Sequence, residues 1–205
     1  MSKPVRLGPL LEQYDFARTR LLARLLGPSF DSGDGREVPI ARLSDEEHLW
    51  EPVPDCWSIR RRQDGPGRGA TSLDGTGSWG RDTTRLAPLP IPVTTIAWRL
   101  DHLTEMVTLR ADHTNGTHTL TRDEHRPTGD ASEAIAAFHR GTGAWRDAIV
   151  SADDEALDQI GRCTYPDGRD GDEPFIDVVW WVNQELLHHG AEIALLRDLY
   201  RAQHG

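Results

Sequence analysis

The sequence predicts an all-α protein, a single domain over residues 1–205 that folds as a four-helix bundle with long crossover loops and a Gly/Pro-rich insert. Two observations predict this class. Apolar side chains recur at helical spacing in four long segments, which are 10–26, 92–115, 130–151 and the chain from 175 onward. The connections between these segments are long, which suits crossover loops better than a series of tight helical hairpins.

The first predicted helix covers residues 10–26. Gly27 and Pro28 follow it directly, and this pair is a typical stop signal. Residues 44–50 are predicted to form a short helix, because the SDEE that begins at Ser44 matches the capping box that opens many helices. The inward positions of the first helix are Leu10, Tyr14, Ala17, Leu21 and Leu25.

Residues 64–90 are dense in Gly, Thr and Pro and are predicted to form one long loop. Segment 92–115 then forms the second long helix, with Pro92 before its start and Thr94 as the predicted N-cap. Its apolar positions are Ile96, Leu100, Leu103, Met106 and Val107.

The remaining helices follow in the second half of the chain. Residues 130–151 form the third long helix, and the acidic stretch 153–161 is predicted to hold a short helical turn. Residues 163–174 form a loop because of their Pro and Gly content, and Phe175 opens the last helix.

Two ionisable residues interrupt the apolar stripe of this last helix. Burying an unpaired carboxylate costs far more free energy than a helix face recovers, so Glu185 needs a proton, a cation or a metal. His189, four residues on, lies about 6 Å further along the helix axis and can share one ion with Glu185. The pair is either half of a metal site or a Glu–His hydrogen bond inside the core. The apolar positions of the stripe are Val178, Val182, Ile193, Leu196 and Tyr200.

A third candidate ligand lies on the second long helix. His102 has Trp98 one turn before it and Met106 one turn after it, so its surroundings are apolar. A lone His in such a place is commonly a core residue. Together with Glu185 and His189, however, it completes a set of three nitrogen and oxygen donors, which is the usual composition of a catalytic metal site with one open position.

With these three candidate ligands, the chain resembles the DinB-like superfamily of metal-binding four-helix bundles. The resemblance covers nearly the whole chain apart from the Gly-rich insert. It implies the bundle fold and the metal site, and it is uninformative about the substrate. It is carried by three segments, SDEEHLWEPVPDCWSIRRR (44–62), PVTTIAWRLDHL (92–103) and NQELLHHGAEIALLRDLYRA (183–202).

The ligand pattern departs from the commonest one in that superfamily, which has a His on the second bundle helix and His-x-x-x-His on the last. Here Glu185 takes the first position of the last pair. The set His102, Glu185 and His189 is similar to that of mycothiol-dependent maleylpyruvate isomerase, where such a site binds zinc and works with a small thiol. The resemblance therefore implies a divalent metal, with zinc preferred and nickel, iron or manganese also compatible with these donors.

The composition agrees with a cytoplasmic protein. The formal net charge of −10 disfavours nucleic acid and anionic membranes as partners. No segment has the pattern of a membrane span or an export signal. Cys56 and Cys163 are too few for a disulfide framework and are expected to be buried structural residues. Lys3 is the only lysine among many arginines, which indicates a GC-rich genome of the actinobacterial kind and favours mycothiol as cosubstrate.

The expected function is a thiol (mycothiol)-dependent transferase or isomerase that acts on a small electrophilic substrate. The alternative is a non-catalytic, stress-related metal-binding bundle. The resemblance to the DinB-like superfamily also implies that the protein is a homodimer.

For the thiol and substrate we expect Arg60 and Trp57 as binding residues, because a guanidinium holds carboxylates bidentately. The alternative for Arg60 is a salt bridge on the acidic surface. We also expect tryptophans around the metal. The insert is expected to lie at the mouth of the site, with Trp79 as its apolar anchor. The alternative for the insert is a mobile surface loop. The four tryptophans expected around the metal are Trp57, Trp98, Trp180 and Trp181.

Overall fold

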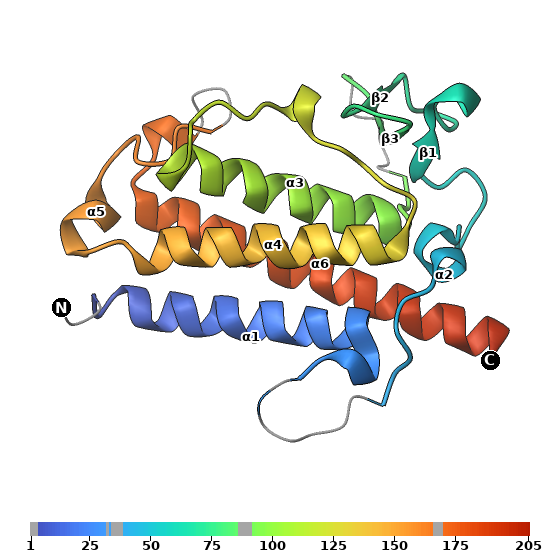
Figure 1. Ribbon diagram of the computed structural model, residues 1–205, viewed down its shortest axis with the longest axis horizontal. Helices are drawn as coiled ribbons and strands as arrows, with labels where there is room; N and C mark the ends of the chain where they lie inside the picture. The colour runs from blue at the N-terminus through green and yellow to red at the C-terminus, as the bar shows by residue number, and fades with distance from the viewer. Residues whose placement is uncertain (1–3, 32, 34–38, 86–91, 166–169) are drawn as a thin grey trace.

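The computed structural model describes residues 4–31, 33, 39–85, 92–165 and 170–205 (Figure 1). Four long helices form the bundle, which confirms the predicted class. None of the helices in the described segments combines the length and apolarity needed to cross a membrane. The long helices are α1 (Leu7–Leu26), α3 (Ile96–Asn115), α4 (Ala131–Val150) and α6 (Phe175–His204).

The helices surround one core in the order α1, α4, α3, α6, since α3 packs on α4 and α6 while α1 packs on the same two helices. Segment 116–130 runs back along α3, so that α3 and α4 are parallel neighbours and α3 and α6 are antiparallel (Figure 1). This is a crossover connection, as predicted. Large aromatic side chains fill the core, with Tyr14, Phe138, Trp145 and Phe175 fully buried.

The ends of the helices follow mostly from local signals. Ser44 caps α2 (Asp45–Leu49) and a short α5 (Asp154–Asp158) forms in the acidic stretch, both as predicted. Asp130, the first residue of the predicted range 130–151, is the N-cap of α4. The predicted N-cap of α3 was wrong by one residue. The Oγ1 of Thr95 accepts the N–H of Trp98 at 3.2 Å, whereas Thr94 pairs as a β-bridge with Trp57. A backbone pairing with a distant segment therefore holds Thr94 out of the capping position.

The insert is not one long loop, and that prediction was wrong. A small antiparallel sheet of order β1-β3-β2 forms from β1 (Ile59–Arg61), β2 (Ser72–Asp74) and β3 (Trp79–Thr83). These strands are three to five residues long and mostly polar, so they lack the alternating pattern that predicts a strand. Residues 86–90 of the insert lie outside the described part of the chain.

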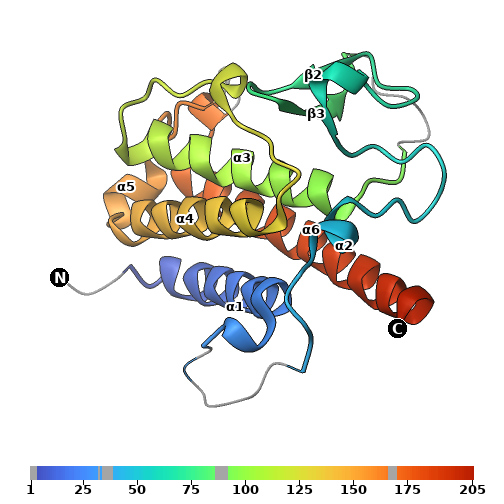
Figure 2. The same ribbon diagram turned by 45° about the vertical axis from the view of Figure 1, so that its right-hand side comes forward.

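The sheet is fixed to the first half of α3 (Figure 2). Arg81 of β3 is buried and forms ion pairs with Asp101 at 3.0 Å and Glu105 at 2.6 Å. The indole N–H of Trp98 donates to the carbonyl of Asp82 at 2.8 Å. A buried Arg with two carboxylate partners is costly to separate, so these contacts hold the sheet beside the α3 segment that carries His102.

Trp79 packs the insert against the segment before α4, and the cavity that it lines contains none of the three candidate metal ligands. Its indole lies against Gly129, where a Cβ atom would come within 2.4 Å of the ring. Because only a residue without a side chain leaves room for the ring, Gly129 is a steric requirement of this contact.

Candidate metal centre

His102 on α3 and Glu185 and His189 on α6 come together across the interface of the two helices. The Nε2 atom of His102 lies 3.2 Å from the Oε2 atom of Glu185, and the Nε2 atom of His189 lies 3.4 Å from the same oxygen. One donor atom from each residue lies within 4.8 Å of the others. The three residues predicted from the sequence therefore form one cluster.

The donor set fits a divalent metal. Ligands bound tetrahedrally to zinc at about 2.0–2.1 Å lie about 3.3 Å from one another. The two distances to Glu185 match this separation. The side chains of His102, Glu185 and His189 are 27%, 22% and 13% exposed, so the cluster is partly open to solvent.

The electrostatics of the cluster favour a cation at its centre. Burial lowers the pKa of His102, which leaves this ring neutral near pH 7. Burial acts in the same direction on His189, but hydrogen bonds to Glu185 and Glu192 outweigh it and raise the pKa of His189. Contacts from both histidines hold the pKa of Glu185 well below its usual range. An ionised carboxylate between two imidazoles makes the cluster attractive to a positive ion.

Glu192 orients the second histidine. Its Oε2 atom accepts the Nδ1–H of His189 at 2.6 Å, and its Oε1 atom lies 3.3 Å from the Nε2 atom of exposed His188. Because an ionised carboxylate can only accept, the proton of His189 is assigned to Nδ1. The Nε2 atom, 3.4 Å from Glu185, is then the ring nitrogen that would bind a metal once it has given up its proton. Carboxylates commonly fix metal-binding histidines in this way.

Arg99 is a residue of the site that the sequence interpretation missed. It precedes His102 by three residues on α3 and forms an ion pair with Glu192, while its Nη1 atom lies 3.2 Å from the Nδ1 atom of His189. Its side chain is 14% exposed, and its buried Nε atom has no hydrogen-bond partner among the residues that the structure describes. Its position one turn from His102 on the same helix was the available signal.

Arg60, expected to bind an anionic group, has protein partners instead. Its guanidinium donates to Asp82 at 2.7 Å, to Glu51 at 2.9 Å and to the carbonyl of Cys56 at 2.7 Å. These contacts fit the alternative interpretation, a salt bridge. Arg99 is the arginine that the structure brings into contact with a candidate metal ligand.

The tryptophans are distributed more widely than expected. The ring of Trp98 stacks on His102, with centroids 5.5 Å apart, and forms one wall of the site. Trp57 is buried, and its indole N–H donates to the carbonyl of Arg68 at 3.3 Å. Trp181 packs on Arg110 of α3, and Trp180 is half exposed on α6.

Both cysteines are buried, as expected. Burial raises the pKa of the Cys56 thiol and that of the Cys163 thiol. Each therefore remains protonated near pH 7 and is a poor nucleophile.

Comparison with known protein families agrees with this geometry. Residues 37–193 match the family model of the DinB superfamily. The chain belongs to this superfamily. Its members often bind metals, and the matched range contains all three candidate ligands of this chain. No curated protein and no solved structure matches the chain.

Replacing Glu192 with glutamine tests the support that it gives to His189. The amide can still accept the Nδ1–H, but the negative charge is lost, so we expect metal binding to weaken by about 10–100-fold. Competition with a chromophoric chelator measures this change. The matched control is Glu12→Gln, at an exposed position on α1. Equal affinities for Glu192→Gln and the unsubstituted protein would contradict the orienting role.

Proposed function

We propose that this protein is a divalent-metal-dependent enzyme, and that it uses a small thiol to transform a small electrophilic substrate by transfer or isomerisation. The observation that carries the proposal is the convergence of His102, Glu185 and His189 in a cluster that solvent can reach. Three protein ligands are typical of catalytic sites, whereas structural zinc sites are usually closed by four.

The metal and the protein have different tasks in this proposal. A divalent ion held by the three residues would lower the pKa of a thiol or water molecule and so supply a nucleophile near neutral pH. Zinc is preferred, and nickel, iron and manganese are compatible with the nitrogen and oxygen donors. Glu192 keeps His189 in the tautomer that can bind metal.

We propose that Arg99 binds an anionic group of the thiol or of the substrate. Its positive charge lies beside His189, and its carboxylate partner, Glu192, is shared with both His188 and His189. A guanidinium in this position can hold a carboxylate of the thiol or of the substrate close to the metal. The ring of Trp98 limits the space above His102 and so helps to orient whatever binds.

Mycothiol is the thiol that we propose, on the resemblance of the donor set to that of mycothiol-dependent isomerases and on the scarcity of lysine in the chain. The cytoplasmic location and the homodimer are parts of the same proposal. Trp57, in the segment that leads into the sheet, is proposed with Arg60 as a residue that binds the thiol.

The experiment has two steps. Elemental analysis of the purified protein identifies the metal. The metal-loaded protein is then mixed with mycothiol and a panel of unsaturated or epoxide electrophiles, and thiol consumption is followed. We expect turnover that is lost in Glu185→Gln and retained in Glu12→Gln. A cobalt-substituted sample should also change its visible spectrum when the thiol is added.

Two results separate this proposal from the non-catalytic alternative. A bound metal with no spectral response to thiol and no substrate consumption would favour a bundle that only holds the metal. Absence of metal from a protein purified without chelators, together with no uptake of zinc, nickel, iron or manganese, would refute both.

A further inference from the structure

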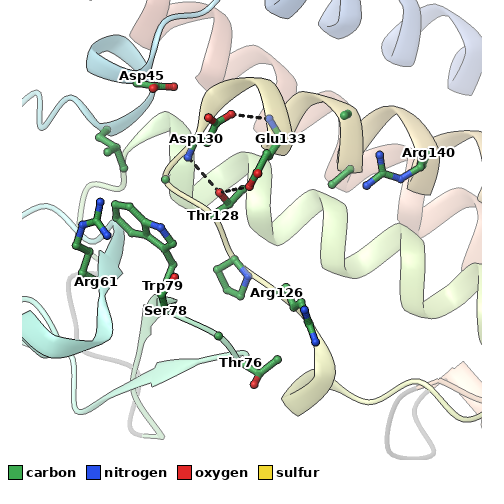
Figure 3. Close-up of a pocket in the computed structure, with 16 residues that line it drawn as sticks. Asp45, Arg61, Thr76, Ser78, Trp79, Arg126, Thr128, Asp130, Glu133 and Arg140 are labelled. Atoms are coloured by element: carbon green, nitrogen blue, oxygen red, sulfur yellow. Dashed lines mark hydrogen bonds between the residues drawn. The ribbon is translucent and has the colours of Figure 1, made fainter.

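A second cavity lies away from the metal cluster. It has a volume of about 870 Å³, is broadly open to solvent and is bordered by α2, the small sheet, segment 126–130 and the first half of α4 (Figure 3). None of the three candidate metal ligands lines it. Its volume falls in the range of about 300–1,000 Å³ that is usual for sites of small organic molecules.

Three arginines from three different elements line this cavity. Arg61 comes from β1, Arg126 from the segment before α4, and Arg140 from α4 (Figure 3). None of them forms an ion pair or a hydrogen bond with another side chain in the described part of the chain. Of the other arginines near the sheet, Arg60 and Arg81 are bound to carboxylates, and Arg62 donates to the backbone carbonyls of the segment 73–75. The cavity therefore presents three exposed guanidinium groups, and no carboxylate of the described residues, including the three in the lining, pairs with them.

The three acidic residues that line the cavity accept hydrogen bonds from groups at the start of α4. Asp130 accepts the N–H of Glu133 at 2.8 Å, and Asp45 accepts the N–H of Ala131 at 2.8 Å. Glu133 accepts the hydroxyl of Thr128 at 3.0 Å. The first two bonds satisfy two of the free N–H groups at the start of the helix, so carboxylates of the protein already occupy this helix N-terminus. The donors left over at the cavity are the guanidinium groups.

Trp79 provides a planar surface beside these charges. The guanidinium of Arg61 stacks on its indole, 4.5 Å from the ring centre, and Gly129 fixes the ring edge. Apolar atoms of Leu49, Pro127 and Ala137 complete the wall. A guanidinium stacked on an aromatic ring keeps its N–H groups free at the rim, so one surface can contact a flat ring and an acidic group together.

From these observations we propose that the cavity binds a small organic anion: a molecule with a carboxylate or phosphate group on a planar, unsaturated ring. The ring would pack against Arg61 and Trp79, and the acidic group would be held by Arg126 and Arg140. This site is independent of the metal centre and of the function proposed for it.

Titration calorimetry of the full-length protein tests the inference with two probes, benzoate and phenyl phosphate, in separate arms. These probes share the ring and differ in the anion, so the arms distinguish a carboxylate site from a phosphate site. We expect saturable binding of at least one probe and none of uncharged benzyl alcohol. Arg126→Ala and Arg140→Ala should each weaken binding by about tenfold, the loss expected for one charge-assisted hydrogen bond.

Arg20→Ala is the matched control. Arg20 is an exposed arginine on α1 that stacks on an aromatic ring, Phe16, as Arg61 does on Trp79, but it lies outside this cavity. We expect its replacement to leave binding unchanged. Binding that weakens equally in Arg20→Ala would show general attraction to arginines and would overturn the assignment.

Two further measurements decide where the probe binds. The indole N–H resonance of Trp79, assigned by its absence in Trp79→Phe, should shift on addition of the probe. Treatment with EDTA should leave binding unchanged. Binding lost after EDTA would place the anion at the metal, and no saturable binding of either probe would refute the site.

Discussion

Replacing His189 with alanine is expected to abolish tight binding of a divalent metal. The change removes one of three donors and also the residue that Glu192 orients. Loss of a polar group that only supports a ligand typically weakens metal affinity by about 10–100-fold, so loss of a ligand should exceed this range. Elemental analysis and chelator competition measure the effect.

The melting temperature of His189→Ala should also respond to metal differently from that of the unsubstituted protein. A ligand that binds only the folded state stabilises it by about 4 kcal/mol at a thousand times its dissociation constant. We therefore expect the melting temperature of the unsubstituted protein to fall on addition of EDTA, while that of His189→Ala stays the same with zinc or EDTA. His139→Ala, at an exposed position on α4, is the control. Unchanged metal content in His189→Ala would contradict the proposed ligand set.

Replacing Arg197 with alanine is expected to lower the free energy of unfolding by about 3–5 kcal/mol, the cost of leaving a buried charge without its partner. Arg197 lies on α6 with its side chain 1% exposed, and it donates to both carboxylate oxygens of buried Glu47 at 2.7 Å. It also donates to the carbonyls of Arg24 and Ala41. One side chain thus joins α6 to α2, to the end of α1 and to the segment between α1 and α2.

Urea unfolding followed by circular dichroism measures this loss. The control is Arg201→Ala, one turn further along α6, whose side chain is 47% exposed and pairs with Asp198. An exposed pair of this kind contributes less than about 1 kcal/mol. If both variants lost the same small amount, the Arg197–Glu47 pair would not be the connection described here.

The sequence by itself determined the bundle and the metal cluster. Helices form through bonds between residues four apart, so the apolar spacing of α1, α3, α4 and α6 is visible locally. Caps such as Ser44 and Asp130 act on the next three residues and are equally local. Glu185 could be identified because a carboxylate on a buried stripe requires a partner, and His102 and His189 were the donors placed to meet it.

Only the tertiary structure decided the small sheet and the residues around the candidate metal cluster. The strands are short and polar, and β1 pairs with β3 across about twenty residues, so no local pattern predicts them. Arg60 and Arg99 are both near the expected site in sequence. Buried Asp82, brought in by β3, holds Arg60, while Glu192, brought in by α6, meets Arg99. The partner of a long charged side chain depends on which distant carboxylate the fold places beside it, and that is a property of packing.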